Sequence, residues 1–61
     1  MEYIASIIYA DTGNPVMDFC FTSNHASDSK AVRIDCVKQL LEKYGAVAKQ
    51  YRVDTICEAE K

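Results

Sequence analysis

Two β-rich runs separated by turn-forming residues open the chain. Residues 3–10 are rich in β-branched and aromatic side chains, and residues 11–15 read Asp-Thr-Gly-Asn-Pro, a composition typical of a turn. Every second residue of the next run, 16–22, is large and apolar: Met17, Phe19 and Phe21. A period of two indicates a strand with one buried face. We therefore predict a β-hairpin over residues 1–22.

The next segment has the periodicity of an amphipathic helix. Ser27, Asp28 and Ser29 are each suitable N-cap residues, and Gly45 can end a helix in a left-handed conformation. At about 100° per residue, large apolar side chains fall on one arc of about 120°, which we expect to face the sheet: Ile34, Val37, Leu40, Leu41 and Tyr44. The polar side chains Asp35, Gln39, Glu42 and Lys43 fall opposite. The pattern predicts a helix over residues 29–45.

A third strand is predicted over residues 47–57, where Tyr51, Val53 and Thr55 alternate. The alternative is that residues 46–51 continue the helix through Gly45, at a cost of about 1 kcal/mol. Residues 58–61 are expected to form a frayed, charged tail. The chain is then one α+β domain, 1–61, of order β-β-α-β. We expect a three-stranded antiparallel sheet of order 2-1-3 with the helix packed on one face.

The first strand is apolar on both of its faces. Tyr3, Ala5, Ile7 and Tyr9 alternate with Ile4, Ser6, Ile8 and Ala10, and one helix covers only one face of the sheet. Burying a large apolar side chain contributes about 1.5 to 3 kcal/mol, so an uncovered second face favours a partner. We predict a homodimer, formed through the open sheet face or by edge-strand pairing. The alternative is a monomer whose C-terminal segment covers that face.

Charge is divided unevenly along the 61 residues, whose net charge is −2. Residues 1–29 contain no Lys or Arg and have a net charge of −4, whereas residues 30–52 have a net charge of +4. This basic stretch is either an ordinary solvated helix face or a patch for an anionic partner. Arg33 falls inside the predicted apolar arc, so its stem lies along the core edge or its guanidinium pairs with an acidic group on a partner.

Candidate chemistry is sparse. Asp11-Thr12-Gly13 matches the active-site tripeptide of aspartic proteases, but these are common turn residues, and we expect Asp11 to hydrogen-bond local backbone. His25 and the three cysteines lack the spacing of structural zinc ligands. We therefore predict no enzyme, no catalytic residue, no metal and no cofactor.

The cysteines and the N-terminal run suggest a compartment. The three cysteines, Cys20, Cys36 and Cys57, are expected to be reduced and mostly buried, with a Cys20–Cys57 disulfide as the alternative. The apolar run at residues 3–10 is too short to cross a membrane and follows no Lys or Arg. These features predict a cytoplasmic protein that does not engage a membrane.

The remaining function is binding. We predict a non-catalytic interaction module, a small regulator or inhibitor encoded by a phage or plasmid, which binds a protein of unknown identity. Its expected contacts are apolar and basic: Tyr3, Tyr9, Phe21, Lys30, Arg33 and Arg52. The alternative is a nucleic-acid-binding protein that uses residues 30–52 with its tyrosines as stacking platforms. The acidic balance of the whole chain disfavours that alternative.

Overall fold

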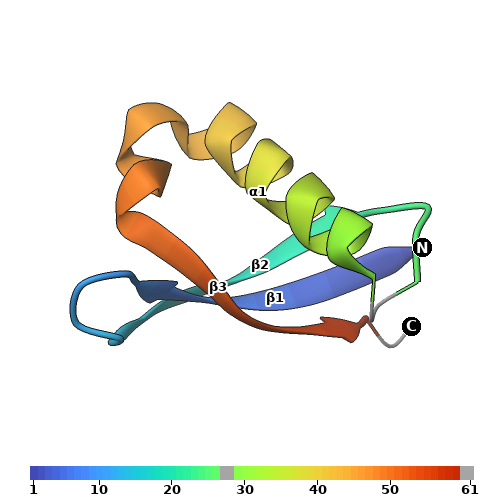
Figure 1. The fold of residues 1–61 in the computed structure, drawn as a ribbon, viewed down its shortest axis with the longest axis horizontal. Helices are drawn as coiled ribbons and strands as arrows, with labels where there is room; N and C mark the ends of the chain where they lie inside the picture. Colours follow the sequence, from blue (N-terminus) through green and yellow to red (C-terminus); the bar gives the residue numbers. More distant parts are fainter. Residues whose placement is uncertain (27–28, 60–61) are drawn as a thin grey trace.

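The computed structural model describes residues 1–26 and 29–59. The elements run in the order β1, β2, α1, η1 and β3, and the three strands form an antiparallel sheet of order β2-β1-β3 (Figure 1). Helix α1 lies across one face of this sheet. The predicted α+β class, strand order and single helix are confirmed. The element bounds are β1 Glu2–Tyr9, β2 Pro15–Thr22, α1 Lys30–Tyr44, η1 Gly45–Gln50 and β3 Tyr51–Glu58.

The hairpin forms because its turn has local partners. Tyr9 donates its backbone N–H to the Asn14 carbonyl at 2.9 Å, and Gly13 donates to the Tyr9 carbonyl at 2.8 Å. Gly13 has a φ of 77°, a conformation that costs glycine little. The register aligns Tyr3 with Phe21, so the period-two side chains of both strands share one face.

Helix α1 is capped at its start by a serine and at its end by a glycine, both of which the sequence indicated. Ser29 is the N-cap, and its hydroxyl accepts the Ala31 N–H at 3.1 Å; Ser27 and Asp28, the other two candidates, lie outside the described residues. Gly45 has a φ of 69° and a ψ of −144°. Its positive φ was expected, but its ψ is not that of a left-handed helix. The Gly45 N–H donates to the Leu41 carbonyl and closes the last turn.

The third strand begins later than predicted. Residues 45–50 form the short 3₁₀ helix η1, so they neither continue α1 nor belong to a strand starting at residue 47. The register between β1 and β3 shifts at a bulge in β3, opposite Ser6 and Ile7 of β1. The bulge moves Thr55 out of the row of Val53, and Ile56 packs against the core in its place. The predicted alternation through Thr55 is therefore wrong, because a bulge inserts one residue into the period of two.

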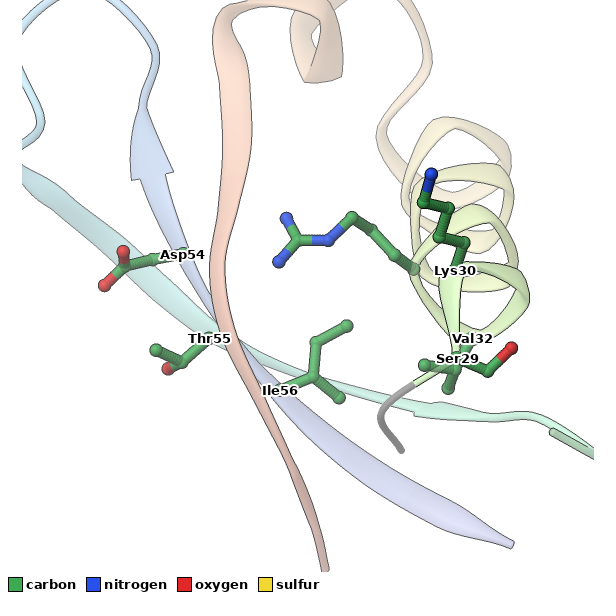
Figure 2. Close-up of a pocket in the computed structure, with 7 residues that line it drawn as sticks. Ser29, Lys30, Val32, Asp54, Thr55 and Ile56 are labelled. Atoms are coloured by element: carbon green, nitrogen blue, oxygen red, sulfur yellow. The ribbon is translucent and has the colours of Figure 1, made fainter. Parts of the chain in front are cut away.

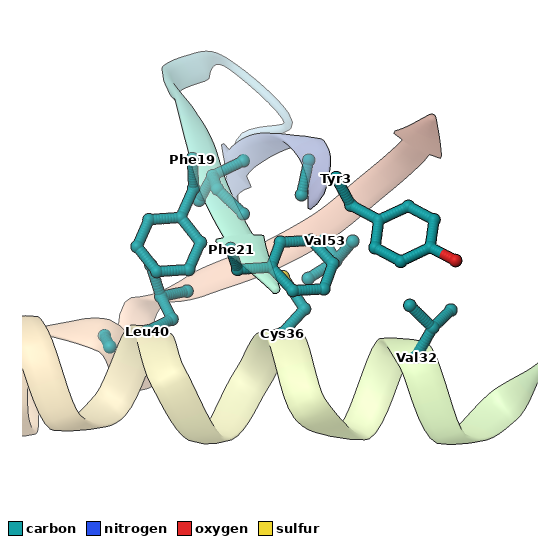
Figure 3. Close-up of a cluster of buried hydrophobic side chains, with 10 residues drawn as sticks. Tyr3, Phe19, Phe21, Val32, Cys36, Leu40 and Val53 are labelled. Atoms are coloured by element: carbon teal, nitrogen blue, oxygen red, sulfur yellow. The ribbon is translucent and has the colours of Figure 1, made fainter. Parts of the chain in front are cut away.

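The core lies between α1 and the sheet. Helix residues Val32, Cys36 and Leu40, spaced by four, point toward the aromatic side chains of β1 and β2 (Figure 3). Tyr3 stacks on Phe21 with ring centroids 5.6 Å apart, and Phe19 lies 6.2 Å from Phe21. Small helix side chains thus pack against large sheet side chains. The buried set is Tyr3, Ala5, Ile7, Phe19, Phe21, Val32, Cys36, Leu40, Ala48 and Val53.

Two polar side chains on α1 set its rotation over the sheet. Arg33 donates from Nη1 to the Val53 carbonyl of β3 at 2.9 Å. Gln39 donates from Nε2 to the Thr22 carbonyl of β2 at 2.6 Å, and its Oε1 accepts the Thr22 N–H at 3.4 Å. Residues three positions from Cys36 lie about 60° to either side of it on a helix. Tied at both flanks, the helix presents Cys36 to the middle of the sheet.

This rotation contradicts the predicted buried arc. Of the five apolar residues expected to face the sheet, only Leu40 is buried. Asp35 and Gln39, expected on the outer side, are half-buried. Asp35 accepts a 2.7 Å hydrogen bond from the Ser23 hydroxyl. The sheet therefore buries the row Val32, Cys36 and Leu40, with hydrogen bonds from Arg33 and Gln39 on its two flanks.

Candidate interaction surface

An exposed row of large apolar side chains runs along α1 and into η1. Ile34 is 54% exposed and Val47 is 43% exposed, and the three side chains between them are 36% to 41% exposed. We call this row the apolar stripe: Ile34, Val37, Leu41, Tyr44 and Val47. Single exposed apolar residues are ordinary, but a contiguous row is typical of a binding surface.

On α1, Ile34, Val37 and Leu41 of the apolar stripe lie on the side that faces β3, whereas Tyr44 packs edge-to-face on Phe19 of β2 with ring centroids 6.2 Å apart. With Cys36 pointing at the sheet, Arg33 lies about 60° to one side, Val37 about 100° and Leu41 about 140° to the same side. Arg33 reaches β3 by its hydrogen bond to Val53. Val37 therefore lies nearer the α1–β3 edge, and Leu41 lies farther round the helix toward solvent.

A groove separates α1 from β3 beneath this stripe. Its wider part, about 390 Å³, is bounded by the start of α1 and residues 54–56 of β3. Figure 2 shows Ile56 pointing toward the helix, whereas Asp54 and Thr55 point away from it. A second hollow of about 230 Å³ lies nearer η1 and includes Val37, Leu41 and Tyr51. Arg33 lines both hollows, so they adjoin along one groove.

Charged side chains lie on both flanks of α1. The β3 flank has Lys30 and Arg33, whereas Arg52 of β3 pairs in register with Ile8 and so lies on the open sheet face. The β2 flank has Asp35 and Glu42, at about 100° and 120° on the other side of Cys36. Lys43 lies over the Phe19 ring of β2, with its Nζ 5.9 Å from the ring centroid, so the β2 side carries both signs of charge while the β3 side of the helix is basic.

Of the six residues predicted from sequence to make contacts, two are wrong. Tyr3 is 0% exposed and Phe21 is 4% exposed, because both pack under the helix. Tyr9 is 37% exposed and packs edge-to-face on Tyr51, with ring centroids 5.7 Å apart. Arg33 donates a hydrogen bond to the backbone carbonyl of Val53. Its guanidinium therefore has a partner within the chain.

The structure places Lys30, Arg33 and Tyr9 on the helix side of the sheet and Arg52 on the open face. Lys30 and Arg33 line the groove, and Tyr9 adjoins it through Tyr51. Sequence reasoning missed the apolar stripe, since it assigned those side chains to the core. One signal was present: residues 32, 36 and 40 form a second apolar row on the helix, and one sheet face cannot bury two rows.

The open face of the sheet differs from this surface. Ile4 and Ile8 are half-buried there, so the expected bare apolar face is only partly exposed. Asp18 and Asp54 line a shallow hollow of about 480 Å³ on this face. Arg52 pairs in register with Ile8 on the same face, so the face carries charges of both signs.

Two of the three cysteines also lie on the open face. Cys20 and Cys57 are exposed, contrary to the prediction of mostly buried thiols, and all three cysteines are free. Both pair in register with Ile4. Strand β1 therefore separates them by about 9.6 Å, two strand spacings. That separation exceeds the ~7 Å Cα limit of a disulfide, which excludes a bond between them in one protomer.

The third cysteine is inert. Cys36 is fully buried between α1 and the sheet. Burial raises the pKa of the Cys36 thiol to about 11, although the nearby Arg33 charge acts in the opposite direction. A thiol with that pKa is protonated near neutral pH and is a poor nucleophile.

The polar cluster at the start of α1 has the composition but not the connections of a hydrolytic triad. Ser23 is 6% exposed and donates its hydroxyl to Asp35 at 2.7 Å, while His25 Nε2 lies 4.0 Å from the same carboxylate. A nucleophilic serine must donate to histidine instead. This cluster therefore ties the loop after β2 to the helix, with Tyr3 donating its hydroxyl to the His25 carbonyl.

Other features that bear on site chemistry are limited. In the turn, the Thr12 hydroxyl accepts the Asn14 N–H at 3.2 Å. Over residues 1–26 and 29–59, no group of three or more His, Cys, Asp or Glu side chains is arranged to hold a metal ion. Neither helix in that same part of the chain has the length and apolar character needed to cross a bilayer.

Comparison with known proteins adds no relative: no protein-family model, no curated protein and no solved structure matches this chain at a significant level.

Proposed function

We propose that this chain is a non-catalytic interaction module that binds another protein through the apolar stripe on α1. The stripe is the observation that carries the proposal. Its side chains are exposed by about a third to a half. Covering the exposed remainder of one such side chain contributes about 1 kcal/mol to binding. Several adjacent anchors of this kind are what a small docking surface requires.

The way α1 is anchored supports the same proposal. Arg33 and Gln39 hold the helix so that the apolar stripe stays outward while smaller side chains fill the core. A pre-formed surface loses little conformational entropy when it binds. A small chain with such a surface suits a regulator or inhibitor that works by occupying its target. A homodimer remains a prediction, which sedimentation of the purified chain tests.

The experiment compares two serine variants in capture and titration. Ile34→Ser with Leu41→Ser removes two anchors of the apolar stripe, and Ile8→Ser makes the same change on the open sheet face. Each immobilised chain is exposed to host lysate, and proteins retained by the wild type are purified and titrated against all three chains. Circular dichroism confirms that the variants are folded.

We expect one protein to bind the wild type and Ile8→Ser with similar affinity and to lose at least tenfold on the stripe variant, or about 1.4 kcal/mol. Equal binding by the stripe variant would refute the proposal. Loss only in Ile8→Ser would assign docking to the open face. Retention of nucleic acid alone, weakening steeply with salt, would support the nucleic-acid alternative.

A further inference from the structure

We propose that two copies of this chain dock through their open sheet faces, with the two-fold axis along β1, so that Cys20 of each copy faces the partner's Cys57. This surface lies on the side of the sheet away from α1, so the inference is independent of the apolar stripe. Both exposed thiols lie on the open face, on the edge strands β2 and β3, and both pair in register with Ile4. Each cysteine is therefore one strand spacing, about 4.8 Å, from β1, on opposite sides of it.

A two-fold axis along β1 exchanges the two edge strands. The rotation turns one open face toward the other and places β2 of one copy opposite β3 of its partner, at the same level along the strands. Cys20 then faces the partner's Cys57, and by symmetry Cys57 faces the partner's Cys20. Sheets packed face to face lie about 10 Å apart, a spacing that the inter-sheet disulfides of β-sandwiches bridge. One rotation thus brings both thiol pairs within reach.

The large side chains on the axis itself are apolar. Ile4 and Ile8 of β1 point to the open face and are half-buried in the single chain. The rotation places each of them opposite its own copy. The partner would cover their remaining exposed area, which favours pairing through the hydrophobic effect.

The charges on the face select this axis over an axis across the strands. Asp18 pairs in register with Ser6 at the centre of the face, so an axis across the strands there would place Asp18 opposite its own copy, and like charges oppose that arrangement. The axis along β1 instead places Asp18 opposite the partner's Thr55, which also pairs with Ser6. The partner's Arg52, which pairs with Ile8, then lies about 7 Å farther along the strand, within reach of its long side chain.

Two other carboxylates must be accommodated in this arrangement. Asp54 borders the same face, so each Arg52 would lie between Asp54 of its own chain and the partner's Asp18. A guanidinium has five N–H donors and can bind two carboxylates. Glu2 is exposed at the start of β1, at the rim of the face, where salt screens its repulsion from the second copy. The charges therefore orient the two copies, while the isoleucines hold them together.

Docking makes two disulfides possible, with oxidised glutathione as the oxidant. The Cys20 thiolate attacks the glutathione disulfide and releases one glutathione thiolate. The partner's Cys57 thiolate then attacks the Cys20 sulfur of the mixed disulfide and releases the second glutathione thiolate. Each new bond oxidises two cysteine thiols and reduces one glutathione disulfide to two glutathiones, which take up the two protons. The two-fold axis repeats the step at the other thiol pair.

The test is complementation between two single variants in a buffer of oxidised and reduced glutathione. Cys20→Ser and Cys57→Ser each remove one thiol from every facing pair, so neither variant alone should form a covalent dimer. An equimolar mixture restores one facing pair. It should form a covalent heterodimer at least about tenfold faster than either variant alone, because docking raises the effective concentration of the two thiols. Non-reducing electrophoresis measures the rates, and mass spectrometry of peptides identifies the bond.

Sedimentation of the reduced chain tests the docking without a disulfide. Ile8→Ser removes an apolar side chain from each open face and should raise the dissociation constant of the dimer by about tenfold or more. Ile34→Ser makes the same change at an exposed position on α1 and should leave that constant unchanged, which makes it the matched control. Docking also covers both thiols, so a thiol reagent should label Cys20 and Cys57 rapidly in dilute chain and more slowly as the chain is concentrated.

The results that would overturn the inference are distinct. A covalent dimer formed equally fast by either single variant would show random collision of exposed thiols. A chain that stays monomeric and gives no heterodimer in the mixture would show that the open face does not pair with itself. A dimer that Ile8→Ser dissociates, but whose mixture gives no heterodimer, would refute the axis along β1. None of these three results changes the expected loss of a protein partner in the Ile34→Ser/Leu41→Ser chain, so the function proposed above is tested separately.

Discussion

The buried thiol of Cys36 should make folding stability depend on alkaline pH. Its pKa in the folded protein is about 11, against an ordinary value of 9.0, chiefly because burial disfavours the thiolate. Between these two values the unfolded chain releases the Cys36 proton and the folded chain keeps it. The unfolded state then binds fewer protons, so the free energy of unfolding must fall as pH rises. Below about pH 8 both states are protonated and the contribution is fully present.

The magnitude follows from the two pKa values. At about pH 10 the linkage relation gives a loss of about 1.4 kcal/mol relative to neutral pH, and the loss approaches about 2.7 kcal/mol above both values. A domain of this size has a free energy of unfolding of about 5 kcal/mol. The loss at pH 10 is therefore large enough to measure by urea denaturation.

The experiment compares the wild type with Cys36→Ala in urea denaturation at neutral pH and at about pH 10, with a reductant present. All other ionisable groups are the same in the two chains, so their contributions cancel in the comparison. We expect Cys36→Ala to lose about 1.4 kcal/mol less than the wild type on going to the higher pH. Equal losses in the two chains would show that the thiol is not buried as described.

Three further outcomes follow from named contacts. A thiol reagent should label Cys20 and Cys57 rapidly in the folded chain and the third cysteine only in denaturant; mass spectrometry would contradict this by finding three labels without denaturant. Ser29→Ala removes the N-cap hydroxyl and should cost about 1 kcal/mol, whereas Ser29→Asp should keep most of it; equal losses in urea denaturation would contradict the cap. Gly45→Ala should cost about 1 kcal/mol because its φ is 69°, and an unchanged midpoint would show that the backbone there can relax.

Elements with a local cause could be predicted from the sequence. The hairpin follows from the period of two and the turn residues, and the helix limits follow from Ser29 and Gly45. The strand order followed because the hairpin fixes one neighbour of β1 and a single crossover leaves its other edge for β3. These features depend on residues close together in the chain.

Features set by long-range partners could not be predicted. The rotation of α1 depends on Arg33 and Gln39 meeting carbonyls on two different strands, 20 and 17 residues away. Helical periodicity showed two apolar rows but not which row the sheet would bury. The bulge in β3 likewise arises from pairing with β1, so the alternation of residues 51–57 did not reveal it. Because the helix rotation and the bulge were not predicted, some candidate contact residues and some core residues were assigned to the wrong positions.

The anchors that rotate α1 also bear on how this chain can bind. Gln39 engages the free edge of β2 at Thr22, and Arg33 engages that of β3 at Val53. Each anchor uses a backbone group that an added strand would need, so edge-to-edge pairing is hindered at both edges. The same two bonds hold the apolar stripe outward. Protection of the edges and exposure of the helix therefore have one cause, and that cause favours docking on the α1–β3 side over strand addition.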